Sequence, residues 1–227
     1  MIKKIKRVIW YLFLSSLLYV VITRFLFPPI TITQITNAFG LGLKRDYVAW
    51  EDMSYNIKLA AIASEDQAFP DHIGVDLEAM ERSFKPKKKK KKSRIPLGGG
   101  ASTITQQVAK NVFLWHGRSW IRKGFEVYFT FLIETLWSKK RIMEVYLNVI
   151  ELGNGVYGVE AASHEYLNKS AAKLTINDAA LMAVVLPNPR KFSIAHPSGY
   201  TLKRRAWCAQ QMRYWGLKLD YDKSKDE

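Results

Sequence analysis

Cysteine is almost absent from this chain of 227 residues, and Cys208 is the only one. A single cysteine forms no disulfide within the chain, and it excludes a metal site built mainly from thiolates. Stretches of alternating polar and apolar residues are also rare, and there is no internal repeat. Because 48% of the residues are hydrophobic and the pattern from residue 55 onward is mostly helical, we expect a mainly α-helical fold with its own core.

Acidic residues are outnumbered, with 20 Asp and Glu against 35 Lys and Arg, which gives a net charge of +15. A strongly basic chain is typical of proteins that bind nucleic acid or an anionic membrane. However, Lys85 and the run from Lys87 to Lys92 supply a large part of this excess. The basic character is therefore partly local, and the run itself is expected to be solvated or attracted to an anionic membrane surface.

The N-terminus carries a long apolar run, residues 8–27, preceded by several basic residues. Its length of about twenty residues suits a helix that crosses a bilayer, and its one charge, Arg24, lies near the far end, where the long side chain can reach the headgroups. A cleaved signal peptide is the alternative, but the run is long for one and no small-x-small cleavage pattern follows it. We expect a retained anchor over residues 1–29, with the N-terminus in the cytoplasm.

Beyond the anchor we expect a linker over residues 30–54, a folded domain over 55–216 and a polar tail over 217–227. Within the domain, residues 85–100 combine lysines, prolines and glycines and predict a mobile loop. Helices are expected from residue 56, with Asn56 as N-cap, from Thr103 in a capping box with Gln106, from Ser119, over 138–152 and over 177–187. The helix after Ser119 is apolar around most of its circumference and is expected to be buried.

Two adjacent acidic residues, Glu65 and Asp66, fall at the end of the first of these helices. A helix C-terminus is an unfavourable place for anions, so their position needs an explanation from elsewhere in the fold. Taken alone, the pair is also compatible with a surface turn.

Two further polar groups occupy predicted helices. Thr103, Gln107 and Lys110 recur at i, i+4 and i+7, on a helix whose first N–H groups we expect to be accessible. Arg122 and Glu126 have the spacing of an ordinary ion pair worth about 0.3–0.5 kcal/mol. Together with Glu65, these groups combine separated carboxylates with several cations, as transfer of a group from an anionic leaving group requires. The cations are Lys110, Arg118, Arg122 and Lys123.

Four segments, "EDQAFPDHIG", "GASTITQQVAKN", "RKGFE" and "KKRIMEVYLNVIELG", occur in this order within residues 56–215. In order and spacing they resemble the glycosyltransferase domain of peptidoglycan polymerases, family 51. With one span and no room for a transpeptidase domain, the chain is similar to monofunctional members from Gram-negative bacteria. The resemblance implies a lysozyme-like helical lobe with a smaller lobe next to the membrane, and a catalytic domain in the periplasm, anchored by a single pass in the inner membrane.

The activity that the resemblance implies is polymerisation of lipid II into β-1,4-linked glycan, with inversion and release of undecaprenyl pyrophosphate. Glu65 matches the catalytic base and Glu126 the second essential glutamate, which assists departure of the pyrophosphate directly or through a divalent cation, Mg²⁺ or Mn²⁺. No dedicated ligand cluster for a cation is visible, so no cofactor is certain. The partners implied are lipid II, the growing strand, the membrane and other cell-wall synthesis or division proteins, but no nucleic acid.

The same resemblance assigns further site residues. Lys110 and Arg118 match pyrophosphate-binding positions, whereas Asp66, Phe69 and His72 support the first motif, Phe69 by packing and His72 by hydrogen bonding. The other cleft positions are Ser102, Thr103, Gln107, Arg122 and Lys123. The lysine run and Ala101, where a glycine is commoner, depart from the family pattern without touching a matched catalytic position.

Two other functions remain open from the sequence. A lytic transglycosylase or lysozyme-like hydrolase shares a helical lobe and a catalytic glutamate, but it gives no reason for cations beside the carboxylates. A non-enzymatic, membrane-anchored basic scaffold would act through the lysine run.

Overall fold

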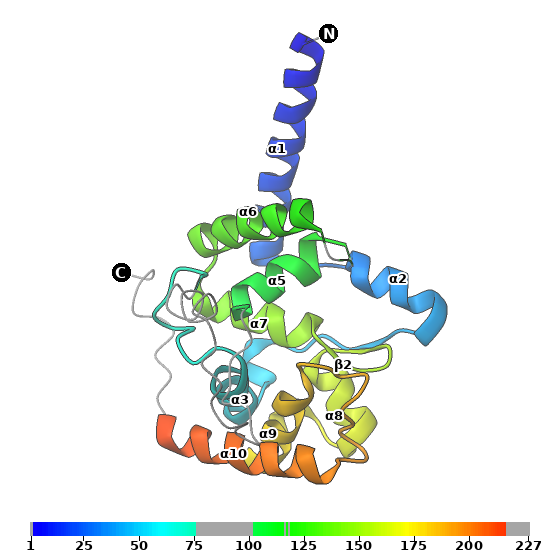
Figure 1. Cartoon of the computed structure of the whole chain (residues 1–227), viewed down its shortest axis with the longest axis vertical. Coiled ribbons are helices and arrows are strands. Elements are labelled where there is room, and N and C mark those ends of the chain that lie inside the picture. The colour runs from blue at the N-terminus through cyan, green and yellow to red at the C-terminus, as the bar shows by residue number, and fades with distance from the viewer. Residues whose placement is uncertain (1, 76–101, 116, 118, 217–227) are drawn as a thin grey trace, which may run out of the picture.

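The computed structural model describes residues 2–75, 102–115, 117 and 119–216. One long helix, α1 (Ile2–Phe25), stands out from the rest of the protein, which is built mainly of helices (Figure 1). The mainly α-helical fold predicted from the sequence is therefore confirmed. The other elements are α2 (Ile32–Leu41), α3 (Tyr55–Glu65), α5 (Ile104–Phe113), α6 (Trp120–Leu136), α7 (Lys139–Val149), α8 (Val159–Leu167), α9 (Ile176–Val185) and α10 (Gly199–Trp215), with short 3-10 helices at Trp50–Asp52 and Ala171–Lys173 and strands β1 (Lys44–Arg45), β2 (Glu151–Gly153) and β3 (Val156–Tyr157).

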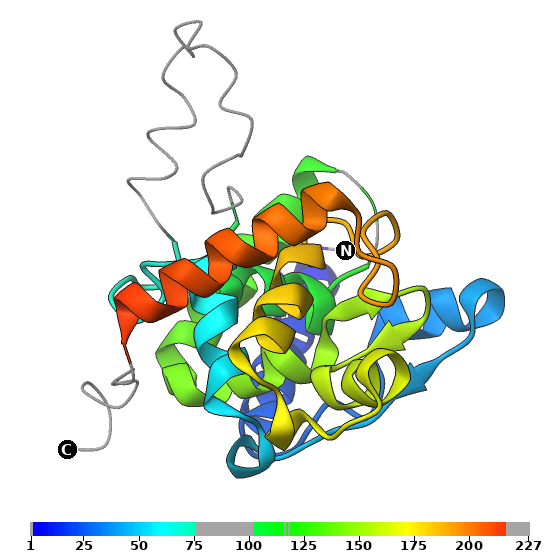
Figure 2. The same cartoon turned by 90° about the horizontal axis from the view of Figure 1, so that it is seen from below.

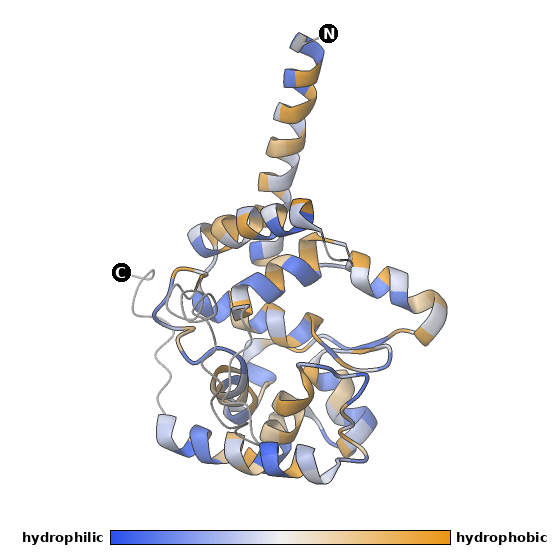
Figure 3. Cartoon of the chain, viewed as in Figure 1, coloured by the Kyte–Doolittle hydropathy of each residue, from blue (hydrophilic) through white to orange (hydrophobic). Residues whose placement is uncertain are grey.

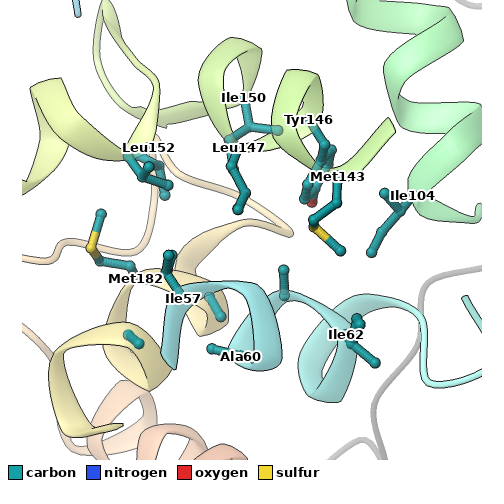
Figure 4. Close-up of a cluster of buried hydrophobic side chains, with 14 of the residues drawn as sticks. Ile57, Ala60, Ile62, Ile104, Met143, Tyr146, Leu147, Ile150, Leu152 and Met182 are labelled. Atoms are coloured by element: carbon teal, nitrogen blue, oxygen red, sulfur yellow. The ribbon is translucent and has the colours of Figure 1, made fainter. Parts of the chain in front are cut away.

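The helices pack in two groups. α3 packs against α9 and α10 at the end of the molecule far from the N-terminus, whereas α5 packs against α6 and α7 near α1 (Figures 1 and 2). The two groups meet through a common core, in which Ile57 and Ile62 of α3 face Met143 and Tyr146 of α7 (Figure 4). α3 is thus covered on several sides, which explains why Ile57 and every later residue of this helix is buried.

A small sheet lies beside the helices, with strand order β1-β3-β2. β1 runs parallel to β3 and β2 runs antiparallel to it. Because β1 comes from the segment before α3, this pairing ties residues 44–45 to a part of the chain more than a hundred residues away.

Two local predictions need correction. The N-cap of α3 is Ser54, whose hydroxyl accepts a hydrogen bond from the backbone N–H of Asn56, while the Asn56 amide instead donates to the carbonyl oxygen of Leu174 at 2.9 Å. The predicted linker over residues 30–54 contains a helix that was not predicted from the sequence, α2, which starts at a capping box of Thr31 and Gln34. The predicted loop at 85–100 and tail at 217–227 lie outside the described residues.

The prediction that α6 is buried is wrong. Trp120, Ile121 and Phe131 expose 92%, 72% and 68% of their surface, while Glu126 and Thr130 on the same helix are buried. Apolar side chains are exposed along both α1 and α6, and the hydropathy colouring marks both helices as rich in apolar residues (Figure 3). An apolar helix face satisfies the same sequence pattern whether it meets a protein core or lipid, so the pattern did not separate the two.

α1 is long and apolar enough over Lys3–Phe25 to span a membrane, and an 18-residue stretch within it has a mean hydropathy of 1.8. Its C-terminal end is fastened to the folded domain. The indole N–H of Trp137 donates to the carbonyl oxygen of Val20 at 2.9 Å, and the Arg141 guanidinium donates to those of Thr23 and Leu26 at 3.0 and 2.9 Å. These contacts make the C-terminal end of α1 part of the tertiary structure.

Candidate active site

Glu65, the first carboxylate of the predicted site, is the last residue of α3 and is 7% exposed. The side-chain amide of Gln107, on α5, donates a hydrogen bond to Oε2 of Glu65 at 3.0 Å. Burial raises the pKa of Glu65 above its ordinary value, and the Gln107 hydrogen bond and the charges of Arg204 and Lys110 oppose that rise. A carboxyl group with a raised pKa that is held in one orientation is suited to accept a proton.

Asp66 has a different environment from Glu65, although the two are adjacent. Its carboxylate accepts hydrogen bonds from the backbone N–H of Ile104 and from Nε2 of His72, both at 2.9 Å. Asp66 therefore binds the N-terminus of α5, where an anion is favourable. This corrects the expectation that the first N–H groups of α5 are accessible, because Asp66 and Thr103 already occupy the N–H groups of Ile104 and Gln106.

The other residues of the first motif hold its loop in place. Phe69 is fully buried; its ring is nearly perpendicular to that of His72, with ring centres 6.1 Å apart, and the Lys139 ammonium lies 4.7 Å from its centre. The Thr103 hydroxyl donates to the carbonyl oxygen of Gly74 at 2.6 Å, while it also caps α5. The structure therefore places Phe69, His72 and Thr103 as supports of the loop that follows Glu65.

Glu126, the second carboxylate, lies on α6 and is 3% exposed. Arg122 binds it at 2.7 Å through a guanidinium nitrogen, and the Lys123 ammonium binds its other oxygen. The predicted i, i+4 pair is present, but it is a nearly buried ion pair with a second cation rather than a solvated surface pair. Two cations are therefore held in one place by a single carboxylate.

Lys110, on α5, is influenced by the charges of both glutamates. Burial lowers its pKa, and the charges of Glu126 and Glu65 oppose this fall, while those of Arg122 and Lys123 reinforce it. Lys110 thus lies within electrostatic range of both glutamates. Glu65, Lys110 and Glu126 belong to three different helices, α3, α5 and α6.

Two of the predicted cleft residues receive less support. Ser102 is half-buried and directly precedes the cap of α5, whereas Arg118 lies outside the described residues. For a divalent cation, the part of the chain that the structure describes contains no group of three His, Cys, Asp or Glu side chains that could hold a metal ion. The neighbours of Glu126 are cations, so the described residues do not fit a metal site of their own.

A groove that the sequence did not indicate lies between α1 and α6, with a volume of about 580 Å³. Its lining is almost wholly apolar, and one polar contact crosses it, between the hydroxyls of Ser16 and Tyr128 at 2.7 Å. The lining residues on α6 occupy the face of the helix opposite to Glu126 and its partners Arg122 and Lys123. The lining comprises Ile9, Leu12, Phe13, Ser16, Ile121, Gly124, Phe125, Tyr128 and Phe129.

Two residues near Glu65 were also missed. The Tyr146 hydroxyl, on α7, lies 3.4 Å from the side-chain oxygen of Gln107, and Arg204, on α10, acts electrostatically on Glu65. Both lie on helices that come much later in the sequence than α3. No local pattern connects them with Glu65, so only tertiary packing reveals the relationship.

The chain matches the family model described as Transglycosylase over residues 32–213. It is similar to the biosynthetic peptidoglycan transglycosylases of Mannheimia succiniciproducens (52% identity, covering 79% of this chain and 71% of that protein) and Shewanella oneidensis (46%, covering 90% and 88%). The protein of the same name from Pseudomonas savastanoi pv. phaseolicola is 42% identical and covers 93% of this chain and 90% of its own length. The family match begins at the first residue of α2, before the predicted start of the domain. The family model that covers most of the chain and these relatives together show that the chain belongs to the transglycosylase family.

Proposed function

We propose that this protein is a peptidoglycan glycosyltransferase that polymerises lipid II into β-1,4-linked glycan strands and releases undecaprenyl pyrophosphate. The relatives described above are named biosynthetic peptidoglycan transglycosylases. The observation that carries the proposal is a pair of buried carboxylates in different settings: Glu65 accepts a hydrogen bond from the neutral amide of Gln107, whereas Glu126 binds the cations Arg122 and Lys123. One carboxylate can then act on the acceptor while cations bound to the other act on the leaving group.

In the proposed reaction Glu65 accepts the proton of the 4-hydroxyl of the N-acetylglucosamine at the acceptor end. The hydroxyl oxygen forms a bond to the anomeric carbon of the donor as the bond from that carbon to the pyrophosphate breaks. Attack from the opposite face converts an α-linked donor into a β-linked product in one displacement. The Gln107 hydrogen bond holds the accepting carboxylate in one orientation.

The cations counter the charge that develops on the leaving group. Lys110, Arg122 and Lys123 lie around Glu126, and Glu126 keeps the two α6 cations near the site before substrate binds. Guanidinium and ammonium groups held in a partly buried cleft stabilise a pyrophosphate more strongly than they would in water. Arg118 is proposed to add a further contact, as the family motif implies. Ser102 and Thr103 are proposed to border the same cleft.

We also propose that the protein is a single-pass protein of the cytoplasmic membrane with its catalytic domain on the outer, periplasmic side. The basic residues in the first turns of α1, ahead of its apolar part, favour this orientation. The apolar groove between α1 and α6 and the exposed apolar face of α6 lie beside the anchor, where the hydrocarbon part of a lipid-linked substrate would be. Tethering the enzyme confines it to the surface that carries both substrates.

The direct test is incorporation of labelled lipid II into glycan by the purified full chain in detergent. Glu65→Gln should lower the rate by about 10²–10⁴-fold, because the amide cannot take the proton. Glu165→Gln, on α8 and paired with exposed Lys44, is the matched control and should polymerise at the wild-type rate. A Glu65→Gln variant as fast as this control would refute Glu65 as the base.

Two further experiments test for a divalent cation and for hydrolase activity. Assays with and without chelator on the wild type and Glu126→Gln determine whether a divalent cation takes part. Release of soluble muropeptides from purified sacculi, without polymerisation, would instead support a hydrolase.

A further inference from the structure

Helix α2 has its polar side toward the protein and its apolar side outward. On the inner side it packs against α5, Thr33 and Gln34 are buried, and the Asn37 amide donates a hydrogen bond to the hydroxyl of Tyr157. On the outer side the Phe39 ring is 91% exposed. This arrangement is the reverse of that in a helix on the surface of a globular core, where the apolar side is covered and the polar side meets water.

The exposed apolar side chains of α2 form one face. Ile32, Ile35 and Phe39 recur at i, i+3 and i+7, which places them on the same side of the helix. Thr36 borders this face, and its hydroxyl donates to the carbonyl oxygen of Thr33 at 3.0 Å. Single exposed apolar residues are common, but a whole apolar face opposite buried polar side chains indicates contact with an apolar medium or partner.

Both ends of α2 are fixed to the folded domain. Ahead of the helix, the Tyr47 hydroxyl donates to the carbonyl oxygen of Pro28 at 3.0 Å. Beyond it, the backbone N–H of Lys44 donates to the carbonyl oxygen of Gly155 at 2.8 Å, next to the pairing of β1 with β3. The domain therefore determines which side of α2 points outward.

The apolar face lies close to the end of the anchor. Only residues 26–31 separate α1 from α2, and Arg141 holds the end of α1 on the domain through two backbone carbonyls. α2 extends sideways from the level at which α1 enters the folded domain (Figure 1). Because α1 is proposed to cross the membrane, its C-terminal end marks the outer surface of the bilayer, and α2 begins there.

The charges around α2 suit a lipid surface. No acidic residue occurs before Asp46, and exposed Lys44 and Arg45 follow the helix closely. Lys44 binds Glu165 at 2.8 Å, whereas the Arg45 guanidinium donates to the neutral carbonyl oxygen of Pro29 and keeps its net charge. An apolar helix face flanked by basic residues is typical of helices that lie between the headgroups and the hydrocarbon. A protein partner would also cover an apolar face, but it would not require a place at the end of the anchor.

We propose that the apolar face of α2 binds the outer leaflet of the membrane, with Ile35 and Phe39 among the upper acyl chains and Arg45 near the headgroups. α2 then provides a second membrane contact beside α1. A single spanning helix leaves a domain free to turn about the axis of that helix, and a second contact stops this rotation. The inference rests on the proposed single-pass topology.

The test locates nitroxide labels on the full chain in vesicles of phosphatidylethanolamine and phosphatidylglycerol. Power-saturation EPR compares the collisions of each label with O₂, which concentrates in hydrocarbon, and with a water-soluble nickel chelate. The label on Phe39→Cys is compared with Leu18→Cys, on the exposed side of α1, as the lipid reference. Tyr214→Cys is the matched water control, because it is an aromatic position 72% exposed on α10, far from the anchor (Figure 1).

The native thiol does not interfere with the labelling. Burial raises the pKa of Cys208 to about 12, so its thiol does not react with the label. A chain without an introduced cysteine verifies this.

The ratio of O₂ to nickel-chelate collisions at Phe39→Cys should exceed that at Tyr214→Cys by at least about threefold and approach that at Leu18→Cys. Ile35→Cys should give the same result, and it keeps the test decisive if one label disturbs the helix. Equal ratios at Phe39→Cys and Tyr214→Cys would place the face in water and overturn the inference. A label on Phe39→Cys shielded from both reagents would indicate a protein partner or a second copy and overturn it equally.

A charge on the face tests whether its apolar character holds it in the lipid. In the Ile35→Cys chain, Phe39→Glu should lower the collision ratio at least about twofold, because a carboxylate is unfavourable among acyl chains. Tyr214→Glu, the control at the far end, should leave the ratio unchanged. Equal ratios in the two variants would refute the contact.

The failure of the proposed topology is distinguishable from the failure of this inference. If the Leu18→Cys label meets the nickel chelate as freely as the Tyr214→Cys label does, α1 does not span the membrane and the topology fails. If Leu18→Cys lies in lipid and Phe39→Cys in water, only the role of α2 fails.

Discussion

Gln107 donates a hydrogen bond to Glu65 at 3.0 Å, and the Tyr146 hydroxyl lies 3.4 Å from the other end of the same amide. The amide oxygen faces Tyr146, so the amide nitrogen faces Glu65. Three helices, α3, α5 and α7, thus contribute to the orientation of one carboxylate. Gln107, which was predicted as a cleft residue, therefore also orients the proposed base, Glu65.

Gln107→Leu removes this donor without greatly changing side-chain size. The carboxylate form of Glu65 loses a hydrogen bond, so the pKa of Glu65 should rise and the acid side of the kcat/KM profile should move to higher pH. The pH dependence of lipid II polymerisation measures the change. Gln210→Leu, on the exposed face of α10, is the control, and an acid limb identical in both variants would contradict the assigned hydrogen bond.

The raised pKa of Glu65 also predicts a cost in stability at neutral pH. The folded state binds this proton more tightly than the unfolded chain, so the contribution is fully present below the unfolded pKa of about 4.3 and is lost as the pH rises through the folded pKa. Glu65→Gln should therefore unfold at a higher temperature than the wild type at pH 7. Thermal unfolding in detergent should show this advantage shrinking towards pH 4, and an advantage independent of pH would argue against the raised pKa.

Asp66→Asn tests the cap of α5. The substitution keeps the shape of the side chain but removes the charge that binds Ile104 N–H and His72, so we expect a loss of about 1–2 kcal/mol in the free energy of unfolding. Asp71→Asn changes a nearby exposed carboxylate and should leave stability within about 0.5 kcal/mol. Denaturant unfolding monitored by circular dichroism compares the two, and equal stabilities would refute the capping role.

Gly74→Ala tests how tightly the loop after Glu65 packs on α6. Gly74 has a φ of +73°, and an added Cβ would lie 2.7 Å from side-chain carbons of both Thr130 and Glu134. We expect a loss of more than about 1 kcal/mol in stability and a marked loss of polymerisation, because the loop must shift. Gly40→Ala is the control, since its Cβ would meet no atom of the described residues within 4 Å. Equal behaviour of the two variants would show that the loop tolerates movement.

Local structure was predictable where it depends on neighbouring residues. The capping box of Thr103 and Gln106 and the cap at Ser119 were both predicted, because a cap involves residues only three positions apart. The cap of α3 was misassigned to Asn56, whose side chain is used by the distant Leu174 carbonyl. The exposure of α6 was missed because an apolar pattern does not identify what the helix meets.

For the site, the sequence by itself determined the residue types, the spacing of Arg122 with Glu126 and the motifs that indicate the family. The separation of Glu65 from Asp66 was decided only by tertiary structure, because it depends on where the N-terminus of α5 lies. Spacing along the chain determines which residues share a helix face, but the field at a buried carboxylate depends on every charge that folding brings near it.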